Sequence, residues 1–300
     1  MKKISILILL LVSAIIFTGC NSDQTGSTPL SEEEFKAAFD NSKLERIYYL
    51  TDAQAEKLAD FHGNYLNLTS LKTLTPAQAE YIAIFRGKGL DLSALNKMPV
   101  ELAVPISKSR AHRLYLKGLK QISPESIAAL ADFRGYEIFL DNIQELGLDQ
   151  VKALSEFQGK SVYLNGITEL SNNCAQAFAE FQADYLTLDG LVSLSDQQAM
   201  ALSSFGGKGL SLNGLKTVDE IQMKALMGFA GTEIFLNGLI QISDQQAEAI
   251  SKFGGNQIYL IELKSLTDTQ AKYLAEFAGD IFLDGLDKMS ADIFAKYKME

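Results

Sequence analysis

Apolar residues recur along the chain at a fixed spacing of 24 residues, with short polar stretches between them. Nine leucines mark this period, and one more follows after a step of 23. These leucines are Leu68, Leu92, Leu116, Leu140, Leu164, Leu188, Leu212, Leu236, Leu260 and, after the shorter step, Leu283. A unit of this size is too small to bury its own apolar face, so successive units must stack on one another. The period therefore predicts a solenoid over most of the 300 residues.

The unit at residues 186–209 shows the local pattern most clearly. Leu186–Leu188 alternates apolar and polar positions, which predicts a short strand with both leucines inward. Asp189–Gly190 predicts a turn, because glycine accepts positive φ and aspartate can bond the nearby backbone. Ser195 then predicts a helix N-cap, and Gly207 predicts a left-handed C-cap. Each unit is therefore expected to be a strand, a turn and a helix.

The same residue types recur at the same place in most units. The helix-end aromatics are Phe61, Phe85, Phe133, Phe157, Phe181, Phe205, Phe229, Phe253 and Phe277, interrupted by Ser109. The expected C-caps are Gly63, Gly87, Gly135, Gly159, Gly207, Gly231, Gly255 and Gly279, with Ala111 and Ala183 in the two remaining units. The expected N-caps are Thr51, Thr75, Ser123, Ser171, Ser195, Ser243, Thr267 and Ser290. Columns of this kind predict a core and its capped helix ends rather than a cofactor site.

This pattern resembles the leucine-rich-repeat superfamily, whose units of 20–29 residues carry a strand lined by Leu-x-Leu and a helix on the outer side. The resemblance covers residues 42–290 and implies an α/β solenoid with a single parallel sheet on one face and helices on the other. One departure concerns the asparagine that usually follows the strand by a few residues. Leucine occupies that place here, as at Leu191, and the Asn or Asp comes earlier, in an Asn/Asp-Gly pair. The chain therefore resembles a divergent bacterial form of the repeat.

Residues 1–19 have the layout of a secretory signal. A short positive region at Lys2–Lys3 precedes an apolar run over Ile4–Phe17, which is too short for a comfortable membrane span. The final Gly19–Cys20 pair resembles the lipobox of bacterial lipoproteins, and that resemblance implies a lipid on Cys20. An ordinary cleaved signal and an uncleaved anchor are the alternatives.

The segments beside the solenoid are assigned from composition. Residues 20–30, the lipidated cysteine and a small polar run, predict a flexible tether. Residues 31–41 predict a helix that covers the first repeat, with a capping box formed by Ser31 and Glu34. Residues 291–300 are expected to cap the other end. Such caps are needed because an open end would expose the core.

The composition is that of a globular protein, with 47 % hydrophobic and 21 % charged residues. The formal charge is −10, and removal of Lys2 and Lys3 with the leader would take it to −12. An acidic chain is poorly suited to bind nucleic acid or anionic lipid. Once Cys20 carries a lipid only Cys174 remains, so no intramolecular disulfide is available. Cys174 occupies a helix position that is usually Gln, and we expect a semi-buried, inert thiol.

The residue between the two apolar positions of each strand is free to face solvent, and it is often aromatic. Six of ten such positions are aromatic in the series Asn67, Asp91, Tyr115, Phe139, Tyr163, Thr187, Ser211, Phe235, Tyr259 and Phe282. Neighbouring strands lie about 4.8 Å apart, which predicts two stacked clusters separated by Thr187 and Ser211. Exposed aromatic clusters often mark binding sites. The alternative is that these residues stabilise the sheet through cross-strand contacts.

Acidic residues flank this column, and they are expected to face the same side of the sheet. They are Glu137, Asp141, Asp189, Glu233, Asp280 and Asp284. One interpretation is a site for a cation or for a partner with basic groups, and the other is a solvated rim with turn-forming residues. A calcium site would need several oxygens at one point, for which one acid per repeat is weak evidence.

The unit at residues 96–113 departs most from the pattern. Pro105 is expected to break or kink its helix. The unit and its following strand also carry the one dense basic patch, formed by Lys108, Arg110, Arg113 and Lys117. Arg113 and Lys117 are expected on outward positions beside Tyr115. A decayed repeat and a docking site are the two interpretations.

The sequence favours binding over catalysis. His62 and His112 lie about two repeats apart, and no Ser-His-Asp set, zinc-ligand spacing or phosphate loop is present. We expect no cofactor and no metal. The predicted ligand is a protein or peptide, with a glycan as an alternative, and the predicted binding residues are Tyr115, Phe139, Tyr163, Phe235, Tyr259, Phe282, Arg113 and Lys117. Two other hypotheses are an envelope spacer without a ligand and a glycan hydrolase built on two carboxylates.

The expected setting is a bacterial cell envelope, with the monomeric protein held at the membrane only through its N-terminal lipid. Asn21 follows Cys20 in place of Asp, which for the lipoprotein family implies the outer membrane if the organism has two membranes.

Overall fold

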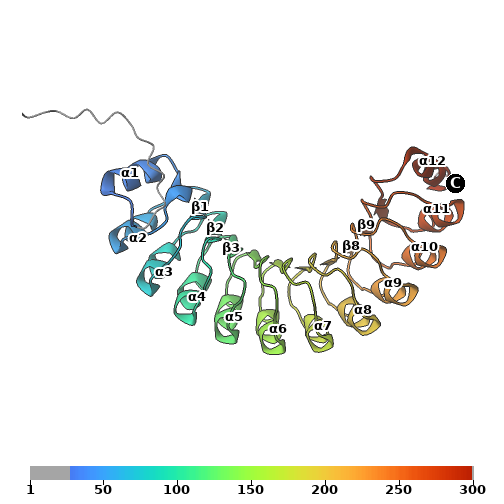
Figure 1. The fold of residues 1–300 in the computed structure, drawn as a ribbon, viewed down its shortest axis with the longest axis horizontal. Helices are drawn as coiled ribbons and strands as arrows, with labels where there is room; N and C mark the ends of the chain where they lie inside the picture. The colour runs from blue at the N-terminus through green and yellow to red at the C-terminus, as the bar shows by residue number, and fades with distance from the viewer. Residues whose placement is uncertain (1–27, 299–300) are drawn as a thin grey trace, which may run out of the picture.

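The computed structural model describes residues 28–298, which form one continuous arc of repeats. The strands line the concave side of the arc and the helices line the convex side (Figure 1). This confirms the predicted fold class, a repeat solenoid with a single parallel sheet. Cys20 and the rest of the predicted leader lie outside the described residues.

Ten short strands form the sheet, and they follow one another in chain order. The strands are β1 (Tyr65–Asn67), β2 (Gly89–Asp91), β3 (Arg113–Tyr115), β4 (Glu137–Phe139), β5 (Ser161–Tyr163), β6 (Tyr185–Thr187), β7 (Gly209–Ser211), β8 (Glu233–Phe235), β9 (Gln257–Tyr259) and β10 (Asp280–Phe282). Every neighbouring pair is parallel, and equivalent positions are in register, as in the pairing of Leu66 with Leu90. The central residue of each strand points inward, so the residues on either side of it face the concave surface.

One helix follows each strand, and further helices precede the first strand. They are α1 (Glu32–Asp40), η1 (Leu44–Arg46), α2 (Asp52–Leu58), α3 (Pro76–Ile82), α4 (Val100–Ser107), α5 (Pro124–Ala131), α6 (Leu148–Ser155), α7 (Asn172–Phe178), α8 (Asp196–Ser203), α9 (Glu220–Leu226), α10 (Asp244–Ser251), α11 (Asp268–Ala275) and α12 (Lys288–Lys298). Helix α1 has the predicted capping box of Ser31 and Glu34. None of the helices within residues 28–298 combines the length and apolar character needed to cross a membrane.

Most of the predicted N-caps are confirmed, since the side chains of Thr51, Thr75, Ser123, Ser171, Ser195, Ser243 and Thr267 accept hydrogen bonds from their first helical turns. Ser290 is the exception. Helix α12 begins earlier, at Lys288, and the amide of Ser290 donates to Asp287 Oδ1 at 2.7 Å. The Ser290 hydroxyl is instead buried and accepts a hydrogen bond from the amide of Leu266 at 2.9 Å. It ties the terminal helix to the preceding repeat.

The core is a continuous stack of leucine, isoleucine and phenylalanine between the sheet and the helices. The helix-end phenylalanines are buried apart from Phe61, and their rings stack from repeat to repeat, as Phe133 does on Phe157 at 6.4 Å between centroids. Burial of one such ring removes a large apolar area from water, worth roughly 1.5–3 kcal/mol. Stacking of incomplete units therefore supplies the core that no single repeat has.

The glycines of the predicted C-cap and turn columns are required by close contacts, and the prediction that they adopt left-handed backbone conformations is wrong. No described glycine has a positive φ. Helix α8 ends at Ser204 in ordinary right-handed geometry, and a Cβ on Gly207 would collide with the Phe205 ring and lie 2.6 Å from the Asp184 carbonyl. A Cβ on Gly190 would likewise collide with backbone carbonyls of the preceding repeat. Glycine allows the turns of successive repeats to nest.

A column of glutamines links successive repeats, and the sequence prediction missed its role. Each side chain accepts a hydrogen bond from the N-cap amide of its own helix and donates to a backbone carbonyl of the preceding repeat. Gln78 does so with Thr75 and with the carbonyl of Leu50, at 3.0 Å each. Cys174 replaces glutamine in this column and is buried, with its sulfur 3.4 Å from the Leu146 carbonyl oxygen. Cys174 was predicted to be semi-buried, and the structure buries it more completely.

The irregular unit keeps its helix. Helix α4 runs from Val100 to Ser107 without interruption, so the predicted break at Pro105 is wrong. Pro105 lies in the last turn of a two-turn helix, where loss of one amide donor affects a single hydrogen bond. Ser109 is buried in place of a phenylalanine, and an open hollow of about 550 Å³ lies beside it.

Candidate concave-face site

Two three-ring stacks dominate the concave surface. In the first, Phe139 lies between Tyr115 and Tyr163, with ring centroids 4.4 and 4.1 Å apart and planes within 17° of parallel. In the second, Tyr259 lies between Phe235 and Phe282, with centroids 4.3 and 4.4 Å apart. The first stack comes from the consecutive strands β3–β5 and the second from β8–β10. The predicted stacking is confirmed, and the role of these residues in binding stays a prediction.

The six rings are half-buried by one another and remain in contact with solvent. Burial raises the pKa of the Tyr163 hydroxyl, and the nearby negative charge of Glu137 adds to that effect. Burial is also the largest cause of the raised pKa of Tyr115. The hydroxyls are therefore neutral at physiological pH, and the rings present flat apolar faces along the axis of the solenoid.

An open slot of about 270 Å³ separates the two stacks. Tyr163 of β5 and Phe235 of β8 lie at its two ends, and its floor is formed by Thr187 of β6 and Ser211 of β7. The Thr187 hydroxyl is buried and makes no hydrogen bond. The sequence predicted the interval between the stacks but not a hollow.

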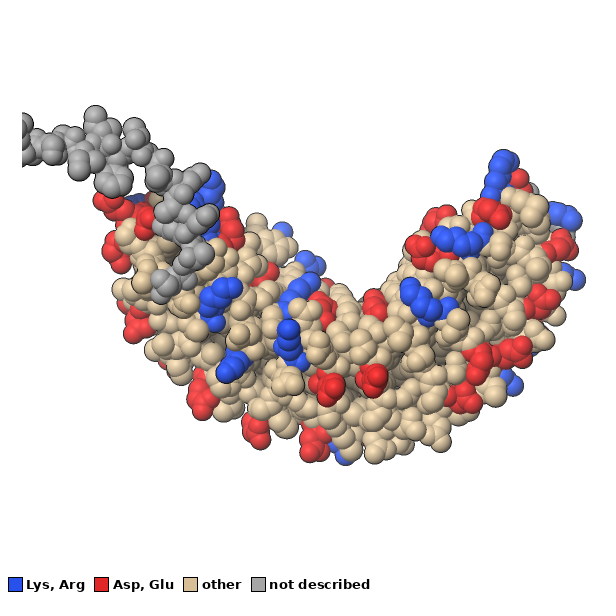
Figure 2. All heavy atoms as spheres, viewed as in Figure 1, with Lys and Arg blue, Asp and Glu red and all other residues tan. Residues whose placement is uncertain are grey.

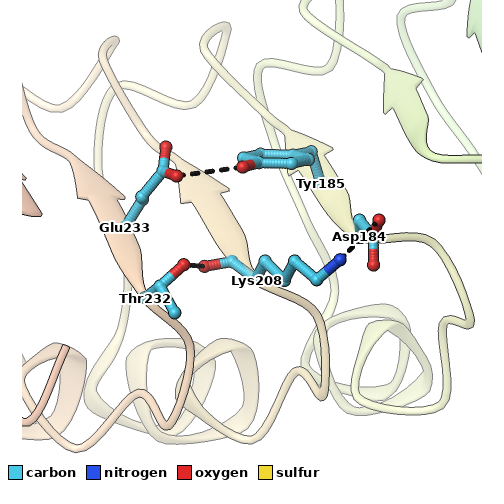
Figure 3. Close-up of polar contacts among 5 residues, drawn as sticks. All are labelled: Asp184, Tyr185, Lys208, Thr232 and Glu233. Atoms are coloured by element: carbon cyan, nitrogen blue, oxygen red, sulfur yellow. Dashed lines mark hydrogen bonds and ion pairs between the residues drawn. The ribbon is translucent and has the colours of Figure 1, made fainter. Parts of the chain in front are cut away.

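Tyr185 forms one side of this slot, and Figure 3 shows its hydroxyl directed at Glu233. Its ring lies over Gly209, where a Cβ would collide with it. Its hydroxyl donates to Glu233 Oε1 at 2.9 Å, two repeats along the chain. Burial, followed by the bond to Glu233, raises the pKa of Tyr185. Tyr185 is not among the predicted binding residues, although a glycine on an outward strand position signals a close approach by another group.

A ladder of Asn and Asp side chains forms the opposite side. Asp189 Oδ1 accepts from the Ser211 hydroxyl at 2.6 Å and from the amide of Asn213 at 2.9 Å. The same pattern continues as Asn213 accepts from the amide of Asn237 at 3.0 Å. Asp141 also belongs to this ladder, because it accepts from the Asn165 side chain at 2.8 Å. These two acids therefore hold the turns together, as the turn-forming interpretation predicts.

The predicted basic residues of the concave face are paired with acids of the next repeat. Arg113 Nε lies 2.6 Å from Glu137 Oε2, and this carboxylate raises the pKa of the guanidinium. Lys117 Nζ lies 3.3 Å from Asp141 and 5.2 Å from the Phe139 ring centroid. Both bases therefore lie beside the first stack, each with its charge neutralised by an acidic side chain.

The other two bases of the predicted patch lie elsewhere. Lys108 and Arg110 follow helix α4 and line the hollow beside Ser109, together with Asp132 and Arg134. The basic patch is thus divided between two surfaces. In the described part of the chain, no three His, Cys, Asp or Glu residues are arranged to hold a metal ion.

Comparison with known proteins shows distant structural similarity only. No family model matches the chain, and no curated protein does. Among solved structures, an internalin (inlF) from Listeria monocytogenes is 13 % identical, with a TM-score of 0.42 over 88 % of this chain and 85 % of the internalin. A chain of the Toll–Spatzle complex from Drosophila is 12 % identical, with a TM-score of 0.45 over 63 % of this chain. This protein spans 25 % of that Drosophila chain. At these scores the similarities do not assign the protein to a family.

Proposed function

We propose that this protein is a lipid-anchored binding module of a bacterial cell envelope, and that its concave face binds a protein or peptide. The supporting observation is the pair of three-ring stacks on the solvent side of the sheet. Clustered aromatic side chains supply much of the energy at protein interfaces. The proposed binding residues are those of the two stacks.

The competing function is a spacer, in which the stacks serve only to stabilise the sheet. Cross-strand aromatic contacts do stabilise sheets. A ladder that served stability alone would gain by continuing across β6 and β7, where Thr187 and Ser211 leave a hollow instead. The hollow between two aromatic walls favours binding.

The binding proposal is tested by replacing one ring in each stack. We expect Tyr163→Ala combined with Tyr259→Ala to abolish capture of the native partner, which is first identified by proximity labelling and pull-down from the envelope with the full chain. A matched control removes exposed apolar side chains from the helical face, Met200→Ala with Ile221→Ala, both of which are more than half exposed. The control should retain the partner.

Partner capture that survives the two ring substitutions in a folded protein would reject this site. A pull-down that reproducibly yields nothing would favour the spacer. Circular dichroism of each variant separates loss of binding from loss of fold.

Anchoring rests on the lipobox-like Gly19–Cys20 pair. We expect Cys20→Ser to release the protein from the membrane fraction into the soluble fraction. Retention of this variant in the membrane, measured by fractionation and immunoblotting, would contradict lipid anchoring and leave the binding test unaffected.

A further inference from the structure

The slot between the aromatic stacks has the dimensions of a site for planar groups. Tyr163 and Phe235 stand three strands apart, which at about 4.8 Å per strand places their backbones about 14 Å from each other. Each ring is stacked on its neighbour through one face, so its other face looks into the slot. The two positions without rings, Thr187 and Ser211, leave room for two planar groups at the spacing seen within the stacks.

The sides of the slot add directional groups to these flat ends. Tyr185 closes one side and holds Glu233 Oε1 through its hydroxyl. Asn213 lies on the other side, fixed by its bonds to Asp189. The occupant must therefore be planar at its faces and polar at its edges.

Charge around the slot favours a cation. No described lysine or arginine forms an ion pair with Glu233. The base drawn in Figure 3, Lys208, is paired with Asp184 at 3.0 Å. In the view of Figure 2, lysines and arginines lie toward both ends of the arc, whereas uncharged and acidic side chains occupy most of its middle. Asp189 beside the slot also forms no ion pair among the described residues, but both of its carboxylate oxygens accept hydrogen bonds from Ser211 and Asn213. The carboxylate of Glu233 is therefore the charged group available to an occupant.

A guanidinium is planar and, unlike the imidazolium of histidine, stays cationic at neutral pH. It combines stacking on aromatic faces with hydrogen bonds to carboxylates. Building on the proposed function, we propose that the slot holds an arginine side chain of the bound protein, stacked on Phe235 and hydrogen-bonded to Glu233. A lysine ammonium is compact and strongly hydrated, so it would gain the charge interaction without the stacking.

The test uses short peptides as probes of the full chain in detergent micelles. The probes are acetylated, amidated Gly-Arg-Gly-Arg-Gly and its lysine and phenylalanine counterparts, titrated while the tyrosine ring signals are followed by NMR. We expect the arginine peptide to shift the signals of Tyr163 and Tyr185 and to bind about fivefold to tenfold more tightly than the lysine peptide. Glu233→Gln should weaken the arginine peptide by a similar factor.

Thr187→Tyr is the variant that fills the slot. It removes a hydroxyl that has no hydrogen-bond partner and adds a ring beside Tyr163, so the fold should tolerate it. We expect it to abolish binding of the arginine peptide. Asn67→Phe adds a ring at the equivalent outward position five repeats earlier, and as the matched control it should leave binding unchanged.

Equal binding of the arginine and lysine peptides, tighter binding of the phenylalanine peptide, or undiminished binding to Thr187→Tyr would each overturn the arginine assignment. These outcomes are distinct from failure of the proposed function. A partner that is lost with Tyr163→Ala and Tyr259→Ala but unaffected by Thr187→Tyr and Glu233→Gln would keep the concave face as the binding surface and reject the slot.

Discussion

The concave face consists of two halves, β1–β5 and β6–β10, whose outward residues follow the same order. Each half begins with a tyrosine that lies over a glycine of the next strand, Tyr65 over Gly89 and Tyr185 over Gly209. Two polar residues and then three stacked rings follow in both halves. Equivalent positions are 120 residues apart except at the last ring, where the final step of 23 makes the offset 119.

The halves differ in the charged group that contacts the first tyrosine. The Tyr65 hydroxyl is 3.4 Å from Arg113 Nη1, whereas the Tyr185 hydroxyl donates to Glu233 at the equivalent position of β8. Arg113 is in turn neutralised by Glu137. The polar residues of the first half also lie at the end of the sheet, with a ring stack on one side only. The same scaffold therefore forms a slot with two aromatic ends and an acidic edge only at its middle.

The two halves share one core, so removing an equivalent buried ring from each should lower stability by a similar amount. This is the largest effect on stability that we expect. Phe85→Ala and Phe205→Ala remove equivalent buried rings. Each should lower the free energy of unfolding by about 3–5 kcal/mol through lost burial and a residual cavity. Urea unfolding followed by circular dichroism measures both. A loss below about 1 kcal/mol in either variant would show that the cores of the two halves are not packed equivalently.

A gain of stability is expected where the first half lacks a ring that the second half has. Ser109 and Ala111 correspond to Phe229 and Gly231, and the Gly231 Cβ position is occupied by the Phe229 ring. Ser109→Phe with Ala111→Gly should fill the hollow beside Ser109 and raise the unfolding free energy by about 0.5–2 kcal/mol.

The single substitution Ser109→Phe serves as the control for this pair. Ser109→Phe alone should destabilise by about 1–3 kcal/mol, because the Ala111 methyl occupies the space of the ring. The unit with Ala183 shows the same conflict, since its Phe181 lies edge-on against Phe178 of its own repeat. A double variant no more stable than the single one would disprove the coupling between ring and glycine.

Local signals predicted the elements well, because each repeat carries its own caps and alternation. Ser195 caps its helix as expected, and the ring stacks follow from strand spacing alone. The role of Gly207 was predicted wrongly, since a glycine in the sequence shows only that no side chain fits. Whether the reason is a positive φ or a nearby ring depends on how the repeats nest, which is set by contacts between units.

The slot could not be predicted from the sequence for the same reason. The bond from Tyr185 to Glu233 spans 48 residues and depends on a ring lying across Gly209. No pattern within one repeat specifies that direction. Periodicity predicts which residues share a face, and side-chain packing decides which of them meet.

The hydrogen bond from Tyr185 to Glu233 distinguishes the two halves. Its loss should have the smallest effect of those predicted here, a change in the pKa of Tyr185. Burial and the negative charge of Glu233 both disfavour the phenolate, so the pKa is raised. Glu233→Gln removes the charge and should lower this pKa toward its ordinary value near 10. Absorbance at 295 nm is followed across an alkaline titration, with Glu233→Gln tested alone and in the Tyr185→Phe background. The second variant separates Tyr185 from Tyr259, whose pKa is raised by burial and also by Glu233.

Because the folded-state pKa of Tyr185 is raised, its contribution to stability is complete below the unfolded value near pH 10 and is lost as pH rises through the folded value. Glu233→Gln should therefore reduce the fall in stability over this interval, whereas Glu169→Gln, at an exposed site, should not. An unchanged Tyr185 titration in the Glu233 variant would show that the hydroxyl does not contact that carboxylate. The acidic edge of the slot would then have to be assigned to another group.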